Sequence, residues 1–350
     1  MTTDTKRTDR VAAAHSANLE RSSVVDLPQD IALFDVFEGY DRFAFPGPIY
    51  RVTGGHGGEA LLICGSEKTA LLDCGMAYCA ENTLQNLMNR LAALGREKPD
   101  YILLSHSHYD HIGALPWIRE AFPGSIVCGS QHCADILQRP GAHALMKELG
   151  EHALQLYEPG STKQIRVDGL GVDRVLRDGD CISLGRETIT AFETKGHTDC
   201  SMSYLLEPLS LLFTSESTGI IEGRPEGTID GRGYIHTPVL KDFHDALQSA
   251  EKCRGLHAKH ICLPHFGMVP QEMLAEYWDD FATECESKMD FVRKMRDGGL
   301  DEETMLARYA DRYWTGVKQM EQPKEAFLLN SKHILKALIK EIDRRDQNGI

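Results

Sequence analysis

From about Tyr50 the chain alternates short apolar runs with polar turns, which is the pattern of buried β-strands. The runs EALLICG (59–65) and TALLDCG (69–75) flank a Gly-Ser-Glu-Lys turn and predict a hairpin. Apolar residues then recur at helical spacing from Asn82, a candidate N-cap, to Gly95, a candidate C-terminal stop. This stretch therefore predicts a β-hairpin followed by an amphipathic helix.

The middle of the chain continues as an alternation of strands and helices. The apolar runs that predict strands are 101–105, 125–130, 188–197, 201–207, 209–215 and 260–264. The segments between them that predict helices are 113–122 and much of 131–165. This order of β and α segments predicts an α/β layered domain rather than a β-sandwich.

Strand patterns end near residue 270, and helical patterns take their place. Apolar residues from Leu274 to Met295 repeat with the period of a long amphipathic helix. Asp301 is placed to cap a second helix, and Ser331 is placed to cap a third. The end of the chain is therefore expected to be a helical extension.

These patterns divide the 350 residues into three parts. Residues 1–44 are predicted to be an N-terminal arm, 45–270 a strand-rich domain and 271–350 the helical extension. Hydrophobic residues make up 42% of the chain and charged residues 26%, which is ordinary for a globular protein. Wholesale disorder is therefore excluded.

Charge limits the partners that the chain can have. It carries 38 Lys and Arg against 52 Asp and Glu, a net charge of −14, and shows no basic cluster. Such a charge repels nucleic acid and anionic membranes, so neither is expected as a partner. The 10 cysteines form no CxxC pair, and residues 1–25 hold no long apolar stretch. We therefore expect a cytoplasmic protein.

The segment SHSHYDH (105–111) carries the chemistry, and it lies where a predicted buried strand gives way to a helix. In an extended stretch, His106 and His108 project to the same side. Asp110 and His111 follow where the chain turns, so they can face a neighbouring point. Imidazoles and a carboxylate suit zinc, iron or manganese, so the segment can supply ligands to two metal ions.

Later segments join this motif in a pattern that resembles the metallo-β-lactamase-fold hydrolase superfamily over about 45–270. They are LLDCG with Asp73, TKGHTD with His197, LFTSE with Glu216 and LPHFG with His265. The resemblance implies a four-layered αββα fold of the α/β class, with the helical extension appended at its C-terminal end.

The resemblance also implies one or two divalent transition-metal ions, zinc first, with iron or manganese as alternatives. One ion would be held by His106, His108 and His197, and the other by Asp110, His111 and His265. An acidic residue bridges both ions in the family, and Asp73 would orient ligands by hydrogen bonding.

The bridging position departs from the family pattern, because Ser215 and Glu216 stand where the family has glycine and aspartate. The longer side chain requires either a retracted backbone or a different metal spacing. We expect Glu216 to be a ligand. The alternative is a glutamate that orients the ligands of a mononuclear site.

Hydrolysis by an activated water follows from such a centre, with Asp110 as the acceptor of the water's proton. The helical extension resembles the glyoxalase-II-like and quinolone-signal thioesterase-like branches, which implies a small acyl substrate: a thioester, an ester or a lactone. Residues near the motifs that could line the pocket are Tyr109, Thr198, Tyr204, Tyr234 and His236.

Several alternatives stay open. A lactonase or a phosphodiesterase would use the same fold, although the lack of a basic cluster speaks against the second. An iron-dependent oxygenase would need one metal, which the second ligand set disfavours. A metal-bearing binding or regulatory protein with little turnover is the alternative of another class. The helical extension has two possible roles: it covers the metal cleft and shapes the pocket, or it is purely structural. In the second case it would only cover the sheet or form the surface of a homodimer.

Overall fold

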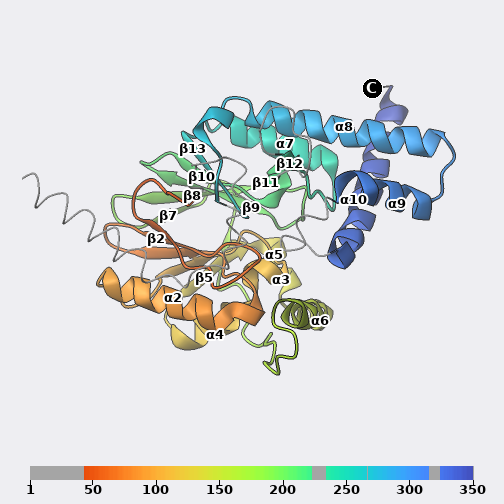
Figure 1. Ribbon diagram of the computed structural model, residues 1–350. Coiled ribbons are helices and arrows are strands. Elements are labelled where there is room, and N and C mark those ends of the chain that lie inside the picture. Colours follow the sequence, from red (N-terminus) through yellow and green to blue (C-terminus); the bar gives the residue numbers. More distant parts are fainter. Residues whose placement is uncertain (1–42, 223–233, 266, 315–323, 350) are drawn as a thin grey trace, which may run out of the picture.

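Two six-stranded β-sheets stack face to face between layers of helices (Figure 1). The computed structural model describes residues 43–222, 234–265, 267–314 and 324–349. Almost all of the predicted N-terminal arm, 1–44, lies outside these residues. The arrangement is the predicted four-layered αββα architecture, with a helical C-terminal extension.

The first sheet contains the first six strands in chain order. They are β1 (Ile49–Arg51), β2 (Leu61–Cys64), β3 (Thr69–Leu72), β4 (Tyr101–Leu103), β5 (Ile126–Ser130) and β6 (Arg174–Leu176). β2 and β3 pair antiparallel with Leu61 opposite Leu72, which confirms the hairpin, and β3 to β6 run parallel. The outer face is covered by α2 (Ala80–Ala93), α4 (Leu115–Ala121) and α5 (Gln131–Ile136).

The second sheet has the order β14-β13-β10-β9-β8-β7. Its strands are β7 (Cys181–Ser183), β8 (Thr188–Glu193), β9 (Met202–Glu207), β10 (Leu211–Phe213), β13 (His260–Leu263) and β14 (Gly267–Met268). The outer face is covered by α7 (Phe243–Arg254). A separate small ribbon pairs β11 (Ile220–Glu222) with β12 (Tyr234–His236).

The apolar runs of both sheets are buried on both faces. In β2, Leu61 and Ile63 pack in the core between the sheets, whereas Leu62 packs under the helices of the outer layer. In β10, Phe213 points between the sheets and Leu212 points toward α7. Because successive side chains of a strand point to opposite faces, a strand covered on both sides needs a continuous apolar run.

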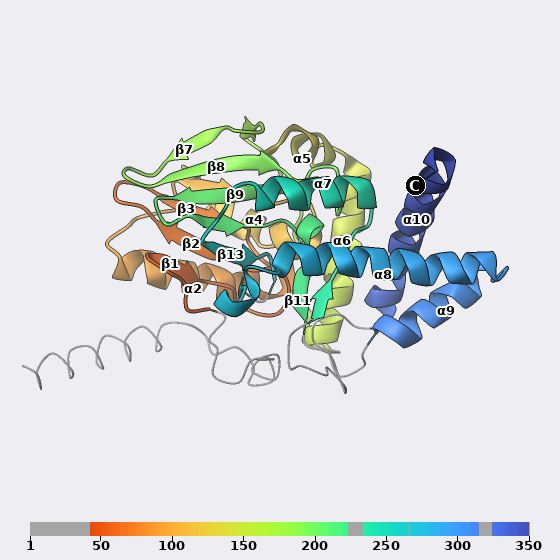
Figure 2. The same cartoon turned by 90° about the horizontal axis from the view of Figure 1, so that it is seen from above.

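In its described residues, the C-terminal extension forms three α-helices that pack together and onto α7. They are α8 (Tyr277–Asp297), α9 (Glu302–Tyr313) and α10 (Lys324–Asn348). Figure 2 shows α8 running alongside α7, with α9 and α10 beyond it. No helix in the described part of the chain is long and apolar enough to cross a membrane.

Of the three predicted N-caps, one is confirmed and two are wrong. The Asp301 side chain accepts a hydrogen bond from the Thr304 amide and caps α9. Asn82 lies inside α2, because a 3₁₀ turn, η2 (Ala77–Cys79), starts the helix earlier; its amide donates to Gly54 O instead. Ser331 does not begin α10, because the helix already includes the core residue Phe327 one turn earlier. The Ser331 side chain is fully buried inside the helix packing.

Candidate metal centre

The predicted ligands gather at one edge of the sandwich, because each follows the C-terminal end of a strand. His106 follows β4, and α3 (Tyr109–Ile112) carries Asp110 and His111. His197 follows β8, Glu216 follows β10 and His265 follows β13. Ligand sites of open α/β sheets commonly lie outside the carboxyl ends of strands. Four segments far apart in the sequence therefore meet at one place.

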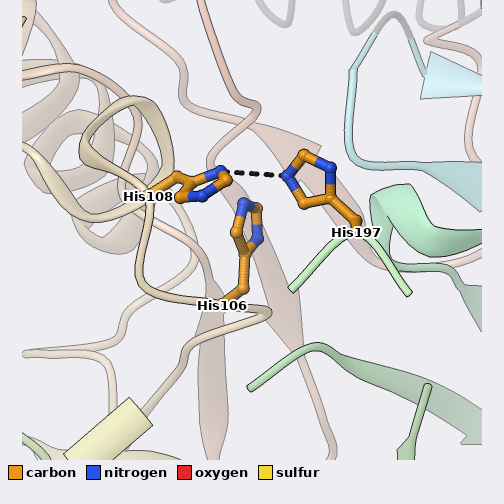
Figure 3. Close-up of side chains that lie close together, drawn as sticks. All are labelled: His106, His108 and His197. Atoms are coloured by element: carbon orange, nitrogen blue, oxygen red, sulfur yellow. Dashed lines mark hydrogen bonds between the residues drawn. The ribbon is translucent and has the colours of Figure 1, made fainter. Parts of the chain in front are cut away.

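The first group is a triad of histidines, His106, His108 and His197 (Figure 3). His197 Nε2 lies 2.9 Å from His108 Nδ1. The ring of His106 lies 4.6 Å from that of His108 and 5.0 Å from that of His197, between centroids. His106 Nε2 is buried and has no hydrogen-bond partner among the described residues. One buried nitrogen of the triad thus lacks a hydrogen-bond partner in the described part of the protein.

The second group is acidic and consists of Asp110, His111, Glu216 and His265. His111 Nε2 lies 2.8 Å from Glu216 Oε1 and 3.1 Å from His265 Nε2. Asp110 Oδ2 lies 3.5 Å from His111 Nε2 and 3.6 Å from His265 Nε2. Like the first group, it brings its ligand-type atoms within 4.8 Å of one another.

The Glu216 carboxylate lies between the two groups. Its Oε1 is 3.6 Å from His106 Nε2, and its Oε2 is 3.5 Å from His197 Nε2. Glu216 begins a short 3₁₀ helix, η3 (Glu216–Thr218), which Ser215 caps through a hydrogen bond from the Ser217 amide. The longer side chain therefore reaches both groups from this turn.

Asp73 orients two histidines at once. Its Oδ1 accepts from the Ser105 amide at 2.7 Å, and its Oδ2 accepts from Ser105 Oγ at 2.6 Å and from His111 Nδ1 at 2.9 Å. Ser105 Oγ in turn lies 3.0 Å from His106 Nδ1. Asp73 holds a left-handed backbone, with φ of 51°, a conformation that costs free energy for a residue other than glycine.

Backbone carbonyls play the same part for two other histidines. His197 Nδ1 donates to Pro238 O, and His265 Nδ1 donates to Gly57 O at 3.2 Å. A histidine that donates from one ring nitrogen keeps the lone pair on the other. These bonds therefore place the lone pair of each ring on the nitrogen that faces the groups, which is the form a metal ligand needs.

Electrostatics differ between the two groups. Burial, and then neighbouring histidines, hold the pKa of His106 well below its usual range and lower that of His108 to about 3. Burial also acts to lower the pKa of His111, but the charge of Asp110 and the hydrogen bond to Asp73 raise it overall. Burial acts to raise the pKa of Glu216, yet His197 and other histidines bring it well below its usual value. His106 and His108 are therefore neutral imidazoles, whereas the second group favours positive charge on His111.

These residues fit metal ions. Metal ligands must be deprotonated, and the first group supplies the neutral imidazoles of His106 and His108, with one buried His106 nitrogen that has no hydrogen-bond partner among the described residues. The second adds carboxylates that stabilise a cation.

Comparison with known proteins places the fold. Residues 53–265 match the family model of the metallo-beta-lactamase superfamily. The chain belongs to this superfamily. A solved metallo-beta-lactamase family protein from Thermus thermophilus superposes with a TM-score of 0.56 at 17% identity, covering 85% of this chain and 95% of that one.

Curated superfamily relatives are distant. A probable metallo-hydrolase of Burkholderia pseudomallei is 30% identical over 148 residues, which cover 41% of this chain and 45% of the relative. The atrochrysone carboxyl ACP thioesterase of Aspergillus fumigatus is 26% identical over 233 residues, which cover 64% of this chain and 58% of the relative. The chain thus spans about half the length of these two relatives.

A cavity of about 560 Å³ adjoins both groups of this superfamily member. One wall is α6 (Pro140–Tyr157), and another is the first turns of α10. Apolar side chains along these walls include Leu149, Leu156, Tyr157 and Leu329. The carboxylates in the lining are those of Asp110, Glu216 and Glu325, and no lysine or arginine is found among the described lining residues.

Only some of the predicted pocket residues line the cavity. Tyr109 and His236 line the cavity. Tyr204 does not, because its place on β9 turns the ring into the core between the sheets, where its hydroxyl donates to Leu104 O at 2.7 Å. Thr198 is buried beside Ser201, and their hydroxyl oxygens lie 2.7 Å apart. Tyr234 belongs to β12, and its side chain lies outside the described part of the structure.

The sequence analysis did not identify the residues of α6 and α10 that form the walls of the cavity. His152 and Tyr157 of α6 and Asn330 of α10 line the cavity. Tyr157 stacks on His56 and Tyr78, with ring centroids 5.0 and 4.9 Å away, which fixes the end of α6 beside the site. The available signal was the pair of leucines at 149 and 156, which are seven positions apart and therefore lie on one face of the helix.

Proposed function

We propose that the protein is a metal-dependent hydrolase that uses an activated water to cleave a small acyl substrate: a thioester, an ester or a lactone. The observation that carries this proposal is the pair of ligand groups, with Glu216 between them, at the floor of an apolar cavity. Pockets for small molecules are mostly apolar with a few polar anchors. The distant likeness to a thioesterase supports the acyl class.

Each ligand group has its own task in this proposal. His106, His108 and His197 would hold one ion, and Asp110, His111 and His265 would hold the other, with Glu216 shared. When bound, such ions lower the pKa of a water and polarise the acyl oxygen. Zinc, iron and manganese all suit these donors, with zinc proposed first.

Asp110 is the proposed proton acceptor. Its side chain is 19% exposed, against 8% for Glu216, and it lines the cavity. A carboxylate has two oxygens, so one can face the ligand group while the other takes a proton from the attacking water. Asp73 cannot take this part, because its two oxygens already accept three hydrogen bonds below the site.

The charge of the cavity favours an uncharged acyl group over a phosphodiester. The described lining side chains include three carboxylates and no lysine or arginine, so a phosphate would meet repulsion beyond the proposed metal centre. We therefore rank lactone hydrolysis as the nearest alternative and phosphodiester hydrolysis below it.

A substrate panel with metal analysis tests the proposal. Protein purified without chelator would be assayed with p-nitrophenyl esters of increasing chain length, acyl-CoA thioesters, homoserine lactones and bis-p-nitrophenyl phosphate, with chelated protein as the control. We expect metal-dependent cleavage of acyl substrates. Cleavage of the phosphodiester alone would make the protein a phosphodiesterase. Bound metal with no turnover of any substrate would favour the binding or regulatory alternative.

A further inference from the structure

The loop between β12 and α7, residues 237–242, holds the segment that carries His197. Pro238 O accepts the hydrogen bond from His197 Nδ1. Gly196 O accepts from the backbone amides of Lys241 and Asp242, both at 3.1 Å. The position of this loop therefore sets the orientation of the His197 ring.

Lysines of the C-terminal extension bind both ends of the loop. Lys288 of α8 donates from Nζ to Thr237 Oγ1 at 2.8 Å, and both residues are fully buried. Lys340 of α10 donates to Asp242 Oδ2 at 2.5 Å, but its side chain is 65% exposed. In both contacts a lysine Nζ donates to a side-chain oxygen of the loop, but the first is buried and the second is exposed.

Burial makes the Lys288 contact the one that fixes the loop. Because Lys288 is fully buried, its Nζ cannot exchange the hydrogen bond to Thr237 Oγ1 for one to water, so loss of this bond costs more than at an exposed site. The ring of Tyr313 adds a face contact at 5.0 Å from Nζ. The exposed Lys340 pair is screened by water and contributes little.

We propose that Lys288 and Thr237 are positioning residues for His197, so that the C-terminal extension keeps a metal ligand in place as well as lining the cavity. This inference rests on the proposed role of His197 as a ligand. The path runs from Lys288 Nζ through the Thr237 hydroxyl and the adjoining Pro238 carbonyl to the imidazole. Its loss would leave the ring free to rotate away from the first group.

Cobalt titration of the metal-free full-length protein tests this path. The test variants are Lys288→Met and Thr237→Val, and the matched controls are Lys340→Met and Thr237→Ser, which keeps the hydroxyl. We expect Lys288→Met and Thr237→Val to weaken binding of one Co²⁺ about 10-fold and to change its visible absorption, as loss of a ligand-orienting partner does. The controls should bind Co²⁺ like the wild type.

Thermal unfolding of the metal-free variants separates positioning from stability. Variants that unfold at lower temperature but bind Co²⁺ with wild-type affinity and spectrum would overturn the inference. Thr237→Val keeps the side-chain shape, so it carries the test if Lys288→Met does not fold. Wild-type protein that binds no Co²⁺ would instead refute the proposed metal centre, which is a different result.

Discussion

Replacing Asp73 with asparagine should weaken metal binding at the second ligand group without removing any ligand. The aspartate accepts three hydrogen bonds with two oxygens, whereas asparagine offers one oxygen and one NH₂ group. If the oxygen accepts from the Ser105 amide, the NH₂ group faces His111 Nδ1. The imidazole must then carry its proton on Nε2, the nitrogen that lies 2.8 Å from Glu216 Oε1 and is needed as a ligand.

The size of the effect follows from the bonds that are lost. A hydrogen bond to a charged group contributes about 1.5–3 kcal/mol. With about 1.4 kcal/mol for each factor of ten, losing one such bond weakens metal binding roughly 10- to 150-fold. His106 should be affected less, because Asp73 reaches it only through Ser105 Oγ.

Competition with a chromophoric chelator measures the two metal affinities of Asp73→Asn. Asp279→Asn is a suitable control, because it removes an equal charge from an exposed ion pair with Arg254. We expect one affinity to fall within the stated range and the other to fall less. Wild-type affinities at both groups, with the same melting temperature, would refute the tautomer argument.

Three further predictions concern turnover, selectivity and stability. Asp110→Asn should lower kcat about 10²–10⁴-fold with metal still bound, measured by steady-state kinetics beside elemental analysis; near-normal turnover would exclude this residue as the proton acceptor. Leu329→Ala should raise KM for the preferred acyl chain and leave the metal content unchanged, because it removes an apolar contact of about 1–3 kcal/mol. An unaltered chain preference would place the acyl group elsewhere. Removing the metal with a chelator should lower the melting temperature, because an ion present at about 1,000 times its Kd stabilises the folded protein by about 4 kcal/mol. An equal melting temperature with and without chelator would contradict metal binding in the folded state.

The sequence predicts the floor of the site well, because the ligands follow buried strands in short motifs. His106 to His111 lie within one loop and helix turn, and the αββα fold brings His197, Glu216 and His265 to them. Their ligand roles stay a prediction until metal is measured. The layered fold could be predicted because buried strands leave continuous apolar runs.

The walls could not be predicted in the same way. Helical periodicity shows that 140–157 has an apolar face, but it does not show which neighbour that face meets. The Tyr204 side chain illustrates a second limit: its direction depends on strand register, which a one-residue shift reverses. The contact of Lys288 with Thr237 joins residues 51 positions apart, and no local pattern marks it.

The separation of floor and walls along the chain has a consequence for how this protein can change. The predicted ligands come from loops after strands, whereas the cavity walls, where we propose that selectivity is set, come from α6 and the beginning of α10. On this proposal, mutations in these two helices would change substrate preference and leave the proposed metal ligands intact, so directed evolution should start there. Insertions within α8 are a poorer starting point, because Lys288 ties that helix to the loop beneath His197.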